Sequence, residues 1–86
     1  MNIITSMAAC AALTLSHIVS AAPVNINSAS AEQIAEALTG IGMSKAQAIV
    51  DYRETYGSFS SADEIVFVRG IGESTYQNNK DDILVE

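Results

Sequence analysis

Two Gly-Ile-Gly triplets are the residues of this 86-residue chain whose types and spacing could support binding chemistry. The first occupies residues 40–42 and the second, 30 residues later, occupies residues 70–72. Two glycines around one aliphatic residue form a compact loop, because glycine takes backbone angles that other residues resist. The isoleucine side chain is expected to turn inward, while the glycines leave the main chain open to another molecule. Each triplet is therefore predicted to be a tight turn between two helices.

A helix that begins directly after such a turn offers a site for an anion. Its first N–H groups have no partner within the helix, and the positive end of the helix dipole lies there. A phosphate group is the natural ligand of these amides. For a single turn, a helix–helix connection without a ligand explains the residues equally well. Two such sites on one rigid body can contact phosphates of both strands across a narrow groove, which positions a protein without reading bases.

Four short helices are expected to position the two turns. Ser30 and Gln33 form a capping-box pattern at the start of the first helix, and Ser61 begins a similar pattern at the third. The helices are expected between Ser30 and Gly40, from Met43 to about Tyr56, between Ser61 and Gly70, and from about Glu73 to Asp81. Residues 66–68 alone would also fit a strand, but the repeat favours a helix. The prediction is an all-α fold that uses one helix–turn–helix unit twice.

The core of so small a domain is expected to be thin. Residues 83–85 close the chain as an apolar tail, and the aromatic side chains are expected to supply much of the core rather than a surface for stacking on bases. These aromatic residues are Tyr52, Tyr56, Phe59 and Phe67.

The first 31 residues carry no charged side chain, and the apolar segment within them has the form of a secretory signal peptide. Small residues gather at its end, just before Pro23. We expect residues 1–21 to be the signal peptide, cut after Ala21, with a cut after Ala22 as the alternative. The uncleaved segment is long enough to anchor the protein in a membrane, since about 20 apolar residues span a bilayer. Both interpretations place the body, residues 22–86, outside the cytoplasm, in the periplasm or tethered to the membrane.

The composition of the body argues against an enzyme. Cys10 and His17 both lie in the leader, so its removal leaves no thiol and no imidazole. Disulfides, Cys/His metal sites and Cys- or His-based nucleophiles are then excluded together. Neighbouring carboxylates remain, such as Asp81 and Asp82, but adjacent residues on a helix point in different directions and such acids usually form a solvated face. We expect no catalytic residues and no metal site.

The body resembles the helix-hairpin-helix DNA-binding domains, and specifically the ComEA-like competence proteins, from residue 24 to about residue 84. The resemblance rests on an ordered series of motifs: VNINSA at 24–29, LTGIG at 38–42, KAQAIVDYR at 45–53, YGSF at 56–59, VRGIG at 68–72 and DI at 82–83. Proteins of this family are secreted or membrane-anchored and bind double-stranded DNA taken up during natural transformation. The resemblance therefore implies an exported receptor that binds incoming double-stranded DNA without sequence preference.

The same resemblance implies which positions would contact DNA. They are the two hairpins with the residues that follow them: Gly40, Ile41, Gly42, Met43, Ser44, Lys45, Gly70, Ile71, Gly72, Ser74, Thr75 and Lys80. Proteins of a DNA-uptake machinery are further candidate partners, no small-molecule substrate is implied, and membrane contact is expected only if the leader stays uncleaved. No cofactor is expected, although a monovalent cation held by hairpin carbonyls, as in some relatives, stays open.

The net charge of −6 must be reconciled with binding to a polyanion. Family members often carry two basic residues after the first hairpin, where this chain has Lys45 alone, and Glu73 directly follows the second hairpin. We expect the first hairpin to carry more of the affinity. The alternative function is a protein-interaction module that keeps the fold but binds DNA weakly or not at all.

Overall fold

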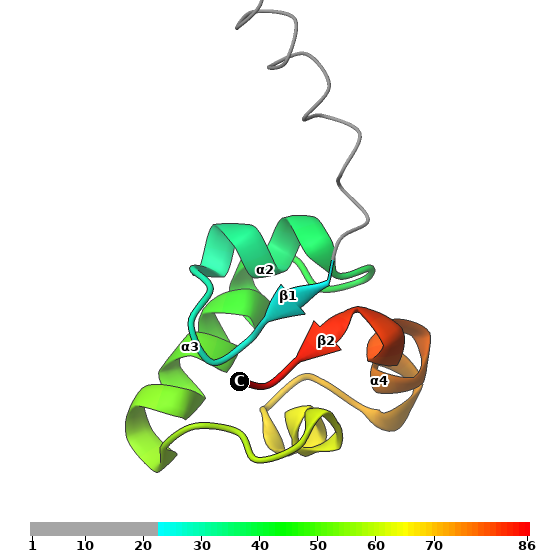
Figure 1. Ribbon diagram of the computed structural model, residues 1–86. Helices are drawn as coiled ribbons and strands as arrows, with labels where there is room; N and C mark the ends of the chain where they lie inside the picture. The colour runs from blue at the N-terminus through cyan, green and yellow to red at the C-terminus, as the bar shows by residue number, and fades with distance from the viewer. Residues whose placement is uncertain (1–22) are drawn as a thin grey trace, which may run out of the picture.

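The computed structural model describes residues 23–86, so the predictions for the leader and its cleavage site lie outside the described residues. The elements, in chain order, are β1 (Val24–Asn25), α2 (Ala31–Ala37), α3 (Met43–Tyr56), the 3-10 helix η2 (Ala62–Phe67), α4 (Glu73–Asn79), the 3-10 turn η3 (Lys80–Asp82) and β2 (Ile83–Leu84) (Figure 1). The predicted helical fold with two helix–turn–helix units is confirmed. In the second unit, a 3-10 helix takes the place of the first α-helix. The capping pattern expected at Ser61 is wrong, because the Ser61 side chain makes no cap hydrogen bond to this helix and its hydroxyl donates to the Asp63 carboxylate instead.

The helix α2 begins at the capping box that the sequence predicts. The Ser30 hydroxyl accepts a hydrogen bond from the Gln33 N–H at 3.2 Å, and the Gln33 side chain accepts one from the Ser30 N–H at 2.9 Å. These reciprocal bonds occupy amides that would otherwise lack a partner at the helix start.

A short parallel strand pair, which helical spacing did not predict, joins the two ends of the body. Val24 in β1 lies opposite Ile83 in β2, and the Ile26 N–H donates to the Leu84 carbonyl at 3.0 Å. Both strands lie between the two helical units (Figure 1). The apolar tail therefore closes the domain by pairing main chains, as well as by burying Ile83.

Two polar side chains tie the segment after β1 to the rest of the fold. The Arg53 guanidinium in α3 donates from Nη1 to the Ile26 and Ala29 carbonyls, at 2.9 and 2.7 Å. The Asn27 amide accepts from the Phe59 N–H at 2.7 Å and donates to the Phe59 carbonyl at 3.0 Å. The Arg53 guanidinium therefore binds main-chain carbonyls of the protein itself.

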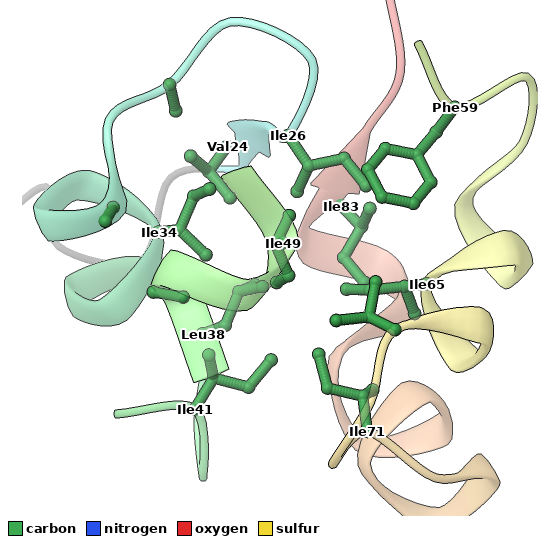
Figure 2. Packing of buried hydrophobic residues seen from close by; sticks show 14 residues of the cluster. Val24, Ile26, Ile34, Leu38, Ile41, Ile49, Phe59, Ile65, Ile71 and Ile83 are labelled. Atoms are coloured by element: carbon green, nitrogen blue, oxygen red, sulfur yellow. The ribbon is translucent and has the colours of Figure 1, made fainter. Parts of the chain in front are cut away.

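Isoleucines are the most frequent residues of the core, and they come from α2, α3, η2, β2 and the segments between the elements (Figure 2). Ile26, Ile34, Ile49 and Ile65 are its largest fully buried apolar side chains. The isoleucines of the two hairpins, Ile41 and Ile71, lie at the same end of the cluster in Figure 2. The core thus anchors both turns from the inside.

The expectation that all four aromatic residues pack in the core is wrong for two of them. Phe59 is buried and stacks on Tyr52, with ring centroids 5.2 Å apart. Tyr56 is 73% exposed and Phe67 is 65% exposed. Tyr56 is the last residue of α3. In η2, three residues per turn place Val68 in line with Ile65, which leaves Phe67 on the outer side.

Within residues 23–86, no helix combines the length and the apolar character needed to cross a membrane.

Candidate functional site

The two Gly-Ile-Gly turns have matching backbone conformations. Gly40 has φ +77° and Gly70 has φ +92°, in the left-handed region that favours glycine. In the second turn the Val68 carbonyl accepts a hydrogen bond from the Ile71 N–H at 3.0 Å, which closes a four-residue turn with Gly70 at its third position. The first glycine of each triplet is therefore required by the turn itself.

The middle and last residues of the triplets have opposite environments. Ile41 and Ile71 are buried, as the sequence predicts, whereas Gly42 and Gly72 are exposed. A methyl group at Gly42 or Gly72 would meet no other atom within 4 Å, and both residues have negative φ values. The fold itself would accept a side chain at these two positions. Their glycines leave the main chain open to an outside molecule.

Both helices that follow the triplets begin without a side-chain cap. Gly42 is the N-cap of α3 and Gly72 is the N-cap of α4, and neither helix has a cap hydrogen bond from a side chain. The first intrahelical donors are the Ala46 N–H, 2.9 Å from the Gly42 carbonyl, and the Tyr76 N–H, 3.1 Å from the Gly72 carbonyl. The amides ahead of these donors have no partner within the helix. By contrast, α2 has its full capping box.

A lysine from the first unit lies against the turn of the second. The Cγ and Cε atoms of Lys45, in the first turn of α3, are 3.7 Å from the position that a β-carbon at Gly70 would occupy. The aliphatic part of Lys45 therefore rests beside the second hairpin. The structure brings this predicted site residue close to both turns.

Arg69 belongs to the candidate site, although sequence reasoning did not select it. It is exposed and lies inside the second turn, between Val68 and Gly70. Thr39 holds the corresponding position of the first turn, 30 residues earlier. Comparing the two turns residue by residue would have revealed Arg69, because the cation lies directly beside the glycine with positive φ.

The remaining predicted site residues divide by location. Met43 and Ser44 are exposed at the start of α3, and Ser74 is exposed at the start of α4, where Thr75 is half-buried. Lys80 is exposed at the opposite end of α4 from Gly72. It follows Asn79, whose side chain contacts the main chain of Thr39, so this end of α4 lies beside the first turn.

Glu73 is the acidic residue nearest to the second set of amides. It is the first residue of α4 and is exposed. Its Oε2 atom accepts a hydrogen bond from the Gln77 side chain at 2.8 Å, one helical turn further on. This bond holds the carboxylate along the helix, yet its negative charge remains at the helix start.

The described residues offer little to a divalent metal. Among residues 23–86, no three His, Cys, Asp or Glu side chains group so that they could hold a metal ion. A monovalent cation would instead use hairpin carbonyls, two of which already accept hydrogen bonds. The Thr39 carbonyl accepts from Asn79 and the Val68 carbonyl accepts from Ile71. Each of these two carbonyl oxygens keeps a second lone pair for a cation, so a monovalent cation at a hairpin stays a prediction.

An open groove of about 320 Å³ lies beside the second turn. It runs between α3 and the end of η2, where Tyr52, Tyr56 and Phe67 supply aromatic surface and Arg69 and Asp51 supply opposite charges. Arg69 therefore borders both the groove and the hairpin.

Comparison with known proteins agrees with this geometry. Residues 19–84 match the family model described as a helix-hairpin-helix motif. An uncharacterized protein of Haemophilus influenzae is 49% identical over 61 residues, which is 71% of this chain and 54% of that protein. ComE operon protein 1 of Bacillus subtilis is 43% identical over 63 residues, which is 73% of this chain and 30% of that protein. The chain thus spans about half the length of the first relative and less than a third of the second. The resemblance to ComEA-like proteins is confirmed.

Proposed function

This chain belongs to the helix-hairpin-helix family, and on that premise we propose that it binds double-stranded DNA without sequence preference. The main-chain amides at the starts of α3 and α4 bind phosphates of the two strands, beside Gly42 and Gly72. As the ComEA-like resemblance implies, the protein is exported and serves as a receptor for incoming DNA in natural transformation. The similarity to ComE operon protein 1 supports this assignment.

One observation carries the proposal: among the three α-helices described in residues 23–86, α2 is capped by a side chain, whereas α3 and α4, which follow the two turns, begin at glycines without a side-chain cap. Ser30 caps α2 with its side chain, whereas Gly42 and Gly72 provide no side-chain oxygen. Glycine is accepted as an N-cap, so the stabilisation lost relative to Ser, Asp or Asn is small, on the order of a few tenths of a kcal/mol. The loss is explained if a phosphate oxygen takes the place of the missing cap.

Substituting Gly42 by Asp or Asn tests this explanation, because a side-chain cap should maintain or raise stability and at the same time weaken DNA binding. The new side chain accepts hydrogen bonds from the amides that a phosphate would use, and Asp also repels the phosphate. We expect Gly42→Asp to keep or raise the Tm while it weakens binding to a mixed-sequence duplex about tenfold or more. Gly42→Asn should weaken binding less, because it blocks the amides without adding charge. Fluorescence anisotropy and thermal unfolding measure the two effects.

The matched control adds the same charge elsewhere on the surface. Ser58→Asp changes an exposed residue beyond the end of α3 and should bind DNA nearly as the unaltered chain does. Equal binding by Gly42→Asp, Gly42→Asn and the unaltered chain would show that the α3 amides do not contact DNA.

The proposed role is binding without catalysis. The carboxylates at two of the acidic positions already accept hydrogen bonds from nearby side chains, Asp51 from Gln47 and Asp63 from Ser61. This supports a structural and solvated role for them. A magnesium-dependent nuclease assay on the purified protein would reveal the catalytic alternative.

A protein-interaction module is the second candidate, and the groove beside the second turn favours it. Tyr56 and Phe67 expose most of their rings there, and exposed aromatic surface often marks a contact with another protein. Proteins of a DNA-uptake machinery would be such partners. A gel-shift series with duplex DNA separates the candidates, because a module that does not bind DNA gives no shift even at low salt.

The location proposed for the body is the periplasm, with a membrane-anchored form as the alternative. The proposal rests on the apolar, uncharged leader and the small residues at its end. The amino-terminal sequence of the exported protein should begin at Ala22 if the cut follows Ala21. A protein that keeps residues 1–21 and remains with the membrane fraction would support the anchored form.

A further inference from the structure

Asn79, at the end of α4, is a buried polar residue whose side chain makes three hydrogen bonds. It is only 2% exposed. Its Oδ1 atom accepts from the Thr39 N–H at 2.7 Å, and its Nδ2 atom donates to the Thr39 carbonyl at 2.8 Å and to the Thr75 carbonyl at 2.9 Å. Both amide hydrogens are used, so the side chain is held in one orientation.

Packing alone does not explain an amide at this position. Asn79 lies seven residues after the N-cap glycine of α4, and the residue seven places after the N-cap glycine of α3 is Ile49. Ile49 is fully buried in the core. An aliphatic side chain therefore serves the equivalent position in the first unit. A buried polar group adds little stability over an apolar one, so the bonds to Thr39 point to another role.

These bonds join the loop of one hairpin to the helix of the other. Thr39 directly precedes Gly40 in the first turn, and Asn79 belongs to the helix that follows the second turn. Lys45 makes the reverse contact, because it lies in the helix after the first turn and rests against Gly70 of the second. The two turns are thus held to each other from both directions.

We propose that Asn79 is a positioning residue that sets the spacing and orientation of the two hairpins. The proposal rests on the proposed function, in which both hairpins bind one duplex. When two binding elements are held rigidly at the right spacing, the second contact forms at a high effective concentration. Loss of the Asn79 bonds leaves each hairpin intact and makes the pair act more independently.

The first test measures the spacing without DNA, so it does not depend on the proposed function. Spin labels are attached at Ser44→Cys and Ser74→Cys, both exposed, in the chain that also carries Cys10→Ser. Electron–electron resonance should give one narrow distance distribution for this chain. Asn79→Leu should broaden the distribution, whereas Ile65→Val, which trims the core elsewhere, should leave it narrow. An unchanged distribution in Asn79→Leu would overturn the proposal.

Asn79→Asp provides a second variant if Asn79→Leu does not fold. Aspartate keeps the size of the side chain and the acceptor for the Thr39 N–H, but it removes the donors to the Thr39 and Thr75 carbonyls. The same broadening is expected. A narrow distribution in this variant would also count against a positioning role.

The second test is a double-mutant cycle on binding to a mixed-sequence duplex. Gly72→Asp blocks the second hairpin in the way that Gly42→Asp blocks the first. Asn79→Leu should weaken binding about tenfold in the unaltered chain and less than about twofold in the Gly72→Asp chain, because spacing no longer matters with one hairpin. Equal losses in both backgrounds would overturn the positioning role. If neither glycine substitution weakens binding, the proposed function fails instead, and the spin-label result still decides on Asn79.

Discussion

The four basic side chains have different roles, although composition counts them alike. Arg53 is engaged by two main-chain carbonyls inside the fold. Lys45 and Arg69 lie at the turns, and Lys80 lies at the far end of α4. Three cations are therefore available to DNA in the proposed binding mode: Lys45 and Arg69 at the turns, and Lys80 at the end of α4 that lies beside the first turn. Glu73 opposes them at the second set of amides.

Replacing Glu73 by lysine should tighten DNA binding. The change removes a negative charge at the start of α4 and adds a positive one, so we expect about a fivefold lower Kd at low salt. Glu54→Lys makes the same change in net charge on the exposed second half of α3 and serves as the control. If both variants tighten binding equally in a low-salt titration, net charge rather than position is responsible.

The opposite effect is expected at Lys45, where charge and packing can be separated. Lys45→Glu should weaken binding severely, by about tenfold or more, because a carboxylate replaces the cation beside both turns. Lys45→Met keeps an aliphatic chain against Gly70 and loses only the charge, so its loss should be smaller. Unchanged affinity in Lys45→Glu would remove this residue from the interface.

The two helix–turn–helix units differ in the length and the capping of their helices. The helix α3 has 14 residues and α4 has seven, and the first unit opens with the capped α2 while the second opens with the 3-10 helix η2. The first hairpin is thus supported by longer and better capped helices. This asymmetry is consistent with the expectation that the first hairpin carries more of the affinity.

The hydrogen bonds from Arg53 in α3 to the segment after β1 should contribute to stability and not to DNA binding. Arg53→Met removes two hydrogen bonds from a charged donor and should lower the free energy of unfolding by about 2 kcal/mol, as measured with urea. Binding to duplex DNA, measured where the variant remains folded, should change little. A variant with normal stability and tenfold weaker binding would place Arg53 at the DNA instead.

At the scale of the whole molecule, the proposed binding to a polyanion must be reconciled with the net charge of −6. Screening makes this feasible, because the Debye length is about 8 Å at physiological ionic strength and remote acids then contribute little. Main-chain amides also carry no formal charge to repel or attract at long range. Binding through them differs from the lysine- and arginine-rich mode that dominates most DNA-binding surfaces.

The salt dependence of affinity should therefore be shallow. Each phosphate neutralised by Lys or Arg contributes about 0.9 to the slope of log K against log salt, so the three cations Lys45, Arg69 and Lys80 allow a slope no steeper than about −3. Titrations with a mixed-sequence duplex between low and physiological salt measure it. A slope near −6 or steeper would require a cationic surface that these residues cannot form.

The sequence by itself predicted the features that depend on near neighbours. The 30-residue repeat, the capping box at Ser30 and the two glycine turns are local, since a turn with positive φ needs Gly40 or Gly70 whatever surrounds it. The inward direction of Ile41 and Ile71 follows from the same turns. These predictions are confirmed because short-range geometry alone determines them.

Features that join distant segments needed the folded chain. The Arg53 side chain donates to a carbonyl 27 residues away, and the Asn79 side chain accepts from a main-chain N–H 40 residues away. Neither hydrogen bond can be predicted from the spacing of neighbouring residues in the sequence. Tyr56 and Phe67 look like core residues by type but are exposed, because aliphatic side chains, seven of them isoleucines, and Phe59 fill the core of residues 23–86. Long-range contacts are chosen by how whole surfaces fit together, so residue type alone could not assign them.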